Sequence, residues 1–151
     1  MKNKIILGLL IIISLLMVAG CSNKQTDQQI IEDDSNLNEV IDSVKVIINS
    51  KEYIIHLEDN ETSRSFIDLL PQEYNMNELN GNEKYIYLDN DLPANPINPK
   101  HINAGDIMLY GDNCLVIFYK SFDTPYSYTK IGHIDNLEDL GKANIKAKFE
   151  K

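Results

Sequence analysis

The sequence predicts a mainly β domain, built as a small closed barrel of about eight strands with one short covering helix. Two observations lead to this fold class. From Val44 onward, apolar residues recur at every second position in short segments separated by turn residues, which is the period of β-strands. Many short strands in few residues would leave sheet edges unpaired, and closing the sheet into a barrel removes those edges.

The domain opens with a predicted hairpin that a helix follows. Apolar residues alternate along residues 44–48 and 53–57, on either side of a short polar turn. Residues 59–62 then place side-chain acceptors and negative charge where a helix begins. Apolar side chains in residues 66–70 form one stripe before a proline ends the helix. This helix is expected to cover an apolar part of the sheet.

A second hairpin and a long loop come next. Residues 73–79 and 83–88 are typical of strands, and the Asn-Gly-Asn turn at residues 80–82 suits the positive φ angles of a tight hairpin. Residues 89–104 contain three prolines, and each proline removes an amide donor that a central strand needs. We therefore predict a long loop over residues 89–104.

A third hairpin and two further strands complete the predicted sheet. Residues 106–110 and 114–120 flank a Gly-Asp-Asn turn, and the second segment is apolar on both faces, as a central strand is. We expect another strand at residues 130–134 and a helical turn at residues 136–140. Alternate positions from Ala143 to Phe149 are apolar and predict a last strand with those side chains inward.

The N-terminus has the pattern of a lipoprotein signal peptide over residues 1–20. Two lysines precede an apolar run, residues 5–18, which leads to two small residues and then Cys21. Such a run spans about 21 Å as a helix, whereas a permanent membrane helix needs about 20 residues. We expect cleavage before Cys21, a diacylglyceryl group on its thiol with acyl chains such as palmitate, and a mature chain held by lipid at the extracytoplasmic face of a bacterial membrane.

The mature chain is predicted to be strongly acidic. Residues 21–42 are polar and acidic with too few apolar residues for a core, so we expect a flexible tether before a domain at residues 43–151. Removing residues 1–20 takes away two lysines and no acidic residue, which changes the formal charge from −9 to −11. An acidic chain is repelled by phosphate backbones and anionic head groups, so we expect no nucleic-acid partner.

Five segments, in this order, resemble the prokaryotic cyclophilin-like domain family. They are Ile48–Tyr53 (INSKEY), Phe66–Pro71 (FIDLLP), Asn80–Lys84 (NGNEK), Ala104–Ile107 (AGDI) and Ile117–Lys120 (IFYK). The resemblance extends over about residues 44–140 and implies a cyclophilin-type β barrel. The family has no agreed biochemical activity, so the resemblance implies a fold before it implies a function.

The resemblance does not extend to the prolyl isomerase machinery of true cyclophilins. Those enzymes use an arginine set among aromatic and amide side chains on the barrel face. The only arginine of this chain, Arg64, lies about 160° around the predicted helix from Phe66 and is expected to face solvent. Gly105 and Asp106 are sufficiently explained as a turn leading into a strand. We therefore expect no prolyl isomerase activity and favour a non-enzymatic role.

Other catalytic or metal-binding patterns are weakly supported. His56, His101 and His133 stand in separate segments without a ligand spacing, and residues 89–91 lack the glycine and distal glutamate of a calcium loop. Cys114 lies in an apolar strand and is expected to be a small buried side chain. The sequence therefore predicts no metal site and no cofactor.

Aromatic side chains gather on or beside the predicted central strands, and Glu83 lies among them in the sequence. Tyrosine combines apolar area with a hydroxyl group, so several tyrosines on one face would line a groove for a ligand. The alternative is that they fill and cap the barrel. The candidate groove residues are Glu83, Tyr85, Phe118, Tyr119, Tyr126 and Tyr128.

Our functional hypothesis is a membrane-anchored, non-enzymatic binding module whose groove receives a peptide or a small molecule. The competing hypothesis is an enzyme, or an accessory subunit that works with a redox or transport partner and docks another envelope protein. Both hypotheses place the activity in the same groove.

Overall fold

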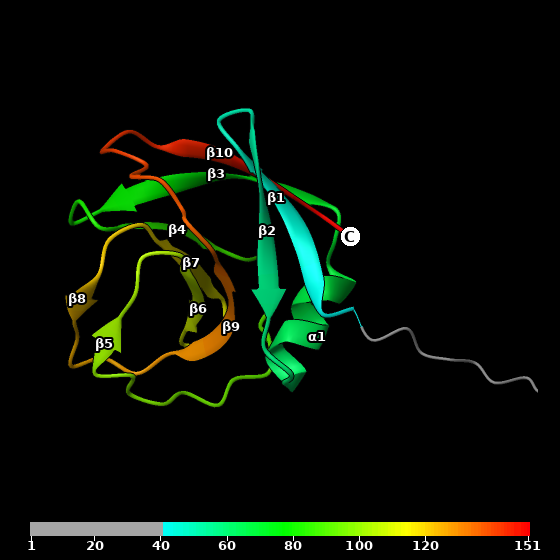
Figure 1. Ribbon diagram of the computed structural model, residues 1–151. Helices are drawn as coiled ribbons and strands as arrows, with labels where there is room; N and C mark the ends of the chain where they lie inside the picture. The colour runs from blue at the N-terminus through cyan, green and yellow to red at the C-terminus, as the bar shows by residue number, and fades with distance from the viewer. Residues whose placement is uncertain (1–40) are drawn as a thin grey trace, which may run out of the picture. The chain divides into compact units, whose positions relative to one another are not determined.

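The computed structural model describes residues 41–151, which form a closed antiparallel barrel of eight strands with one short helix (Figure 1). This confirms the predicted fold class. The predicted signal peptide, Cys21 and all but the last two residues of the predicted tether lie outside the described residues. Within residues 41–151, no helix is long and apolar enough to cross a membrane.

The strands pair around the barrel in the order β1-β10-β3-β4-β7-β6-β9-β2, and β2 pairs with β1 to close it. The two remaining strands, β5 and β8, form a small separate ladder. The strands are β1 (Ser43–Ile48), β2 (Lys51–Leu57), β3 (Gln72–Leu79), β4 (Glu83–Tyr87), β5 (His101–Ile102), β6 (Asp106–Tyr110), β7 (Cys114–Phe118), β8 (Phe122–Asp123), β9 (Thr129–Ile134) and β10 (Ile145–Glu150).

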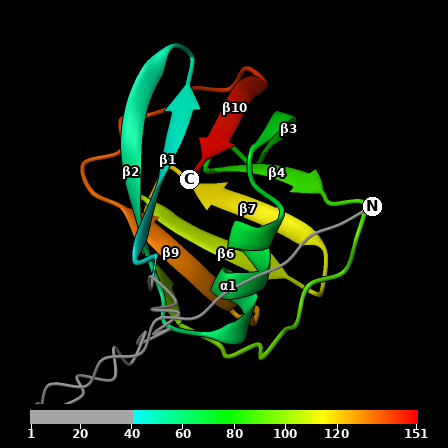
Figure 2. The same ribbon diagram turned by 90° about the vertical axis from the view of Figure 1, so that its right-hand side faces the viewer.

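Helix α1 (Glu61–Asp68) packs an apolar side into the barrel core. Asn60 caps its start, because the Asn60 side-chain oxygen accepts a hydrogen bond from the Ser63 amide at 2.9 Å. Phe66 is fully buried and meets Phe149 of β10 edge to face, with ring centroids 5.4 Å apart. The helix thereby covers the barrel as predicted, in front of the strands in Figure 2.

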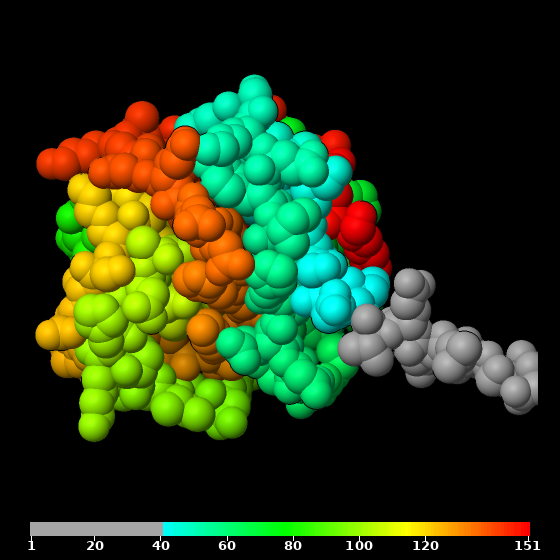
Figure 3. Space-filling model, viewed as in Figure 1, coloured from blue at the N-terminus to red at the C-terminus, as the bar shows by residue number. Residues whose placement is uncertain are grey.

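Within residues 41–151 there are two hydrophobic clusters, one inside the barrel and one on its outer face. Strand β7 separates them, because Leu115 and Ile117 point into the barrel core while Val116 and Phe118 point outward into the second cluster. All five residues of β7 are buried, which agrees with its apolar sequence. The chain around β5 and β8 covers the outer cluster and forms one side of the molecule in Figure 3.

The long connection after β4 differs from the prediction at its C-terminal end. Residues 88–100 are irregular, but His101 and Ile102 form β5 and pair with β8. Inside the loop, the Ile97 amide donates to the Tyr128 carbonyl at 2.9 Å, and the Tyr128 amide donates to the Ile97 carbonyl at 3.1 Å. A strand of two residues is too short to show alternation of apolar and polar residues, so the sequence pattern could not predict β5 or β8.

The connection between β9 and β10 corrects two further predictions. Residues 136–140 do not form a helical turn: Asn136 has a φ of 56° in a turn, and an irregular segment follows. Ala143 is exposed and precedes β10, whereas Ile145, Ala147 and Phe149 point inward as predicted. A positive φ at Asn136 is incompatible with a helix, and this conformation depends on contacts that alternation does not encode.

Candidate functional site

A cavity of about 330 Å³ lies on the outer face of the barrel, beside the outer hydrophobic cluster. Its lining combines five tyrosine rings with one carboxylate. We call it the tyrosine cavity, and the residues that define it are Glu83, Tyr85, Tyr87, Tyr110, Tyr126 and Tyr128.

Strand pairing places one wall and the floor of the tyrosine cavity. Glu83, Tyr85 and Tyr87 alternate along β4, so all three side chains leave the same face of the sheet. Tyr85 is the direct cross-strand partner of Val116 on β7, and Tyr87 is the partner of Cys114. The tyrosines of β4 therefore stand next to a small apolar floor.

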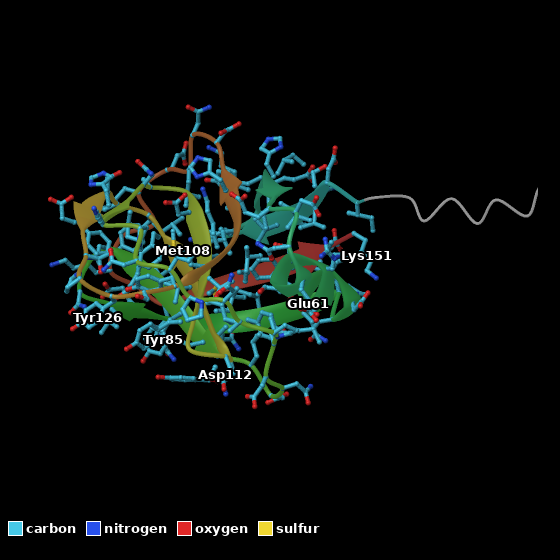
Figure 4. The ribbon with its side chains drawn as sticks, turned by 90° about the horizontal axis from the view of Figure 1, so that it is seen from below. Glu61, Tyr85, Met108, Asp112, Tyr126 and Lys151 are labelled. Atoms are coloured by element: carbon cyan, nitrogen blue, oxygen red, sulfur yellow. The ribbon has the colours of Figure 1, made fainter. Side chains whose placement is uncertain are left out.

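The opposite wall comes from the end of β6 and from the chain after β8. Tyr110 pairs with Cys114 across the ladder and brings its ring 6.2 Å from Tyr126 and 5.5 Å from Tyr128, measured between centroids. Tyr128 is held by its backbone hydrogen bonds with Ile97 and is 8% exposed. Figure 4 shows Tyr85 and Tyr126 at the same edge of the barrel, and both line the cavity.

Three of the five tyrosines are largely exposed although they are large and partly apolar. The exposed fractions are 63% for Tyr87, 47% for Tyr110 and 58% for Tyr126. Exposed aromatic residues that gather at one place mark ligand or partner sites more often than isolated ones do. The tyrosine cavity thus has a buried inner part at Tyr128 and an open aromatic rim.

Glu83 brings an uncompensated negative charge to one end of the tyrosine cavity. Burial raises the pKa of its carboxyl group, the nearby Glu78 raises this pKa further, and an interaction with the Asn80 side chain opposes the rise. Within residues 41–151, no lysine, arginine or histidine forms a salt bridge with Glu83. The same charge contributes to the raised pKa of Cys114 and of Tyr128.

Cys114 lies in the floor of the tyrosine cavity as a thiol with little reactivity. Burial, followed by the charge of Glu83, raises the pKa of Cys114 to about 11. The thiolate is the nucleophilic form, so a thiol with this pKa is a weak nucleophile at neutral pH. Cys114 is buried, which agrees with the structural role expected from the sequence.

Four of the six candidate groove residues line the tyrosine cavity: Glu83, Tyr85, Tyr126 and Tyr128. Phe118 lies beneath it, fully buried, with its ring centroid 5.5 Å from that of Tyr128 and 5.6 Å from that of Phe122.

Tyr119 does not line the tyrosine cavity. It follows Phe118 directly, so alternation turns its side chain to the other face, where the Lys84 ammonium lies 4.8 Å from the ring centroid. Its hydroxyl group donates to the Glu78 carboxylate at 3.3 Å. Burial, followed by Glu78, raises the pKa of Tyr119 to about 12.

Two lining tyrosines were outside the predicted groove. Tyr87 follows Tyr85 by two residues on β4, so the two-residue period of a strand would have predicted that both side chains lie on the same face. Tyr110 comes next to the cavity through the pairing of β6 with β7, and this register is not readable from either strand alone.

Arg64, Gly105 and Asp106, which the sequence analysis compared with the machinery of true cyclophilins, lie outside the tyrosine cavity. Arg64 faces solvent as expected and forms an ion pair with Asp59 at 2.7 Å. Gly105 has a φ of 100° in the turn before β6. Asp106 accepts a hydrogen bond from the Asn103 amide at 2.8 Å and pairs with His133 Nδ1 at 3.0 Å.

The histidines are closer together than their sequence positions suggest. His56 and His133 are cross-strand partners, and Asp135 oxygens lie 3.5 Å and 3.6 Å from their respective Nε2 atoms. Among the residues that the structure describes, no group of three or more His, Cys, Asp or Glu side chains is arranged to hold a metal ion.

A second cavity of about 430 Å³ lies between the start of α1, the loop after β4 and β9. Thr62 and Lys130, two of its polar lining residues, already have protein partners. The Thr62 hydroxyl donates to the Pro93 carbonyl at 2.6 Å, and the Lys130 ammonium lies 3.4 Å from Glu58 and 3.5 Å from Asp106. The tyrosine cavity gathers five tyrosine rings around a half-buried carboxylate that forms no salt bridge within residues 41–151, and it is therefore the better candidate site.

Comparison with known proteins identifies a family but no activity. No curated protein matches this chain. Among solved structures, a hypothetical protein from Archaeoglobus fulgidus, known from its solution structure, aligns with 72% of this chain and 92% of that chain, at 18% identity and a TM-score of 0.46. The sequence profile of the cyclophilin-like family matches residues 46–150, which include nearly the whole barrel, and the chain therefore belongs to the cyclophilin-like family.

Proposed function

We propose that this chain is a membrane-anchored binding module whose tyrosine cavity takes a small organic ligand. One observation carries the proposal: five tyrosine rings and one unpaired carboxylate, from β4, β6 and the chain after β8, converge on a single cavity. Ligand sites are typically concave, mostly apolar and aromatic, with a few polar groups that orient the ligand. The tyrosine cavity has this composition.

The size of the tyrosine cavity favours a small molecule over a long peptide. Its volume of about 330 Å³ lies near the lower end of the range for ligand pockets, roughly 300–1,000 Å³. Of the two ligand classes predicted from the sequence, the small molecule fits this volume better.

The chemistry of the lining supports binding rather than catalysis. Cys114 is a poor nucleophile because its pKa is raised to about 11. Arg64, the arginine that a prolyl isomerase would need on the barrel face, lies on α1 and pairs with Asp59. Within residues 41–151, no histidine, lysine or arginine lines the tyrosine cavity, so no cationic side chain is placed there to act on a bound substrate.

A thermal unfolding screen of the full chain in a non-ionic detergent tests the binding role. Small metabolites at 100 times their dissociation constant add about 2.7 kcal/mol, which raises the Tm of a domain of about 100 residues by several degrees. We expect at least one compound class to raise the Tm. Absence of any shift across a broad panel would contradict ligand binding in this cavity.

Tyr126→Ala locates the site of such a ligand. Tyr126 is 58% exposed, so truncating it should cost little stability but should abolish the ligand-induced shift. Ile54→Ala, on β2, removes an apolar side chain of 45% exposure away from the cavity and should keep the shift. An unchanged shift in Tyr126→Ala would place the ligand elsewhere.

The membrane anchor is part of the same proposal and rests on the sequence of residues 1–21. Expression in a bacterium fed an alkyne fatty acid should label the chain, and the Cys21→Ser variant should lose both the label and cleavage of the signal peptide. Labelling that persists in Cys21→Ser would contradict lipid attachment at this residue.

A further inference from the structure

We infer that the tyrosine cavity is specific for a compact organic cation, an alkylammonium group, with Glu83 as its counter-charge and the tyrosine rings as its walls. The inference rests on the proposed function, because it assigns a chemical class to the ligand of the same cavity. Three properties of the site lead to it: an unpaired charge, free aromatic rings and an apolar floor.

The first property is the charge of Glu83. Its carboxyl group is half-buried at one end of the cavity, and within residues 41–151 no cationic side chain forms a salt bridge with it. A partly buried carboxylate without a cationic partner is unfavourable, and a cation beside it lowers that cost. An anionic ligand would be repelled by Glu83 and Glu78, and a neutral ligand would leave the charge of Glu83 without a counter-charge.

The second property is the availability of the tyrosine rings. The face of an aromatic ring carries negative potential and attracts ammonium groups, and alkylated ammonium ions are bound by cages of such rings. In the described part of the chain, lysine ammonium groups lie over the rings of Tyr53 and Tyr119. None lies over the five rings of the tyrosine cavity, so these rings have no cation of the protein's own.

The third property is the apolar floor. Val116 and Cys114 are buried beneath the tyrosines, and Tyr128 closes the inner end with 8% exposure. Charge interactions strengthen where water is excluded, so a cation held here would be attracted more strongly than at an open surface. The floor can also contact the alkyl groups of an alkylammonium ion. A hydrated metal ion has no alkyl groups and would gain nothing from this contact.

The charge of the whole chain favours the same ligand class. The formal net charge of −9 raises the local concentration of cations near the surface and lowers that of anions. The open rim at Tyr87 and Tyr126 gives such a cation direct access to Glu83 and the inner rings.

Matched ligands that differ in charge test the inference. Titration calorimetry on the full chain would compare choline and tetramethylammonium with 3,3-dimethyl-1-butanol, the neutral analogue of choline with carbon in place of nitrogen. We expect the two cations to bind at least tenfold more tightly than the neutral alcohol. Equal or tighter binding of the alcohol would overturn the cationic assignment.

Variants test whether Glu83 supplies the counter-charge. Glu83→Gln keeps the shape of the side chain and removes its charge, so it should weaken choline binding at least tenfold and leave binding of the neutral alcohol unchanged. Glu52→Gln removes a carboxylate of β2 that is paired with Lys45, outside the cavity, and should bind choline as the parent chain does. Unchanged choline binding in Glu83→Gln would overturn the inference.

The outcomes also separate this inference from the proposed function. If the neutral alcohol binds as well as choline, the tyrosine cavity is a binding site without charge selection. If neither cations nor any compound of the thermal screen binds, the proposed function fails as well.

Glycerophosphocholine distinguishes two sources of the ammonium group: binding as tight as that of choline indicates a lipid head group, and weaker binding indicates a free cation.

Discussion

Lys84 lies fully buried on β4, facing away from the tyrosine cavity. Its ammonium donates to the carbonyl groups of Gly141 and Ala143 at 2.6 Å and 2.7 Å and lies over the ring of Tyr119. Burial lowers the pKa of Lys84, and the charges of Glu78 and Asp139 oppose this effect. One side chain thus holds the irregular segment before β10 against the barrel, a role that no sequence period reveals.

Replacement of Lys84 by methionine tests this role. Lys84→Met keeps the side-chain length but removes two part-buried hydrogen bonds from a charged donor, so we expect a loss of about 1–3 kcal/mol in the free energy of unfolding. Urea denaturation measures the difference. Lys142→Met, at an exposed position of the same segment, should stay within about 0.5 kcal/mol of the parent chain. Equal stabilities of the two variants would show that the carbonyl contacts of Lys84 contribute little.

Glu83 predicts a pH dependence of stability in the absence of ligand. Burial raises the pKa of Glu83 in the folded state, so the folded protein binds the carboxyl proton more tightly than the unfolded chain does. This tighter binding stabilises the fold fully below the unfolded-state pKa, and the stabilisation is lost as pH rises through the folded-state pKa. Glu83→Gln does not undergo this loss, so it should gain stability relative to the parent chain as pH rises above the unfolded-state pKa of a glutamate, about 4.3. Thermal unfolding of both chains at pH values on both sides of this pKa measures the effect. A pH-independent difference would argue against a desolvated carboxylate.

At the scale of elements, local patterns predicted the strands but not how the chain covers them. Alternation along β1, β2 and β10 and the polar turns between paired strands identified the eight barrel strands. The short β5–β8 ladder depends on contacts across the loop, and the turn at Asn136 depends on a positive φ that apolar spacing does not encode. Tertiary contacts decide both features.

The turn before β6 gives a prediction at the same scale. Gly105 has a φ of 100°, and a Cβ atom there would lie 2.1 Å from the Ile134 carbonyl oxygen of β9. Gly111, after β6, has a φ of 65° with nothing within 4 Å of an added Cβ atom. Gly111→Ala should therefore cost about 1–2 kcal/mol for its backbone conformation alone, and Gly105→Ala should cost substantially more. Similar losses in urea denaturation would show that β9 can move away from the turn.

At the scale of the whole molecule, the tyrosine cavity exists because the outer face of the barrel has its own core. Glu83 and Tyr85 share one face of β4, which the two-residue period predicts, whereas the pairing of β4 with β7 is a long-range feature that the sequence analysis did not predict. The positions of Tyr126 and Tyr128 depend on how the chain after β8 folds back over β6 and β7, which only long-range contacts determine. The sequence could suggest these two tyrosines as groove residues, but its local patterns do not fix their positions.

The two cores share β7, which predicts that they unfold together. Phe118 belongs to the outer cluster and Phe149 to the barrel core, and both are fully buried. Phe118→Ala and Phe149→Ala should each lower the free energy of unfolding by about 3–5 kcal/mol in a single transition. Hydrogen exchange would then show amides of β1 and β7 losing protection together in both variants. If Phe118→Ala instead exposed only the amides of β5, β7 and β8 while β1 kept its protection, the outer cluster would unfold separately from the barrel core. Ligand binding in the tyrosine cavity would then stabilise the outer cluster alone.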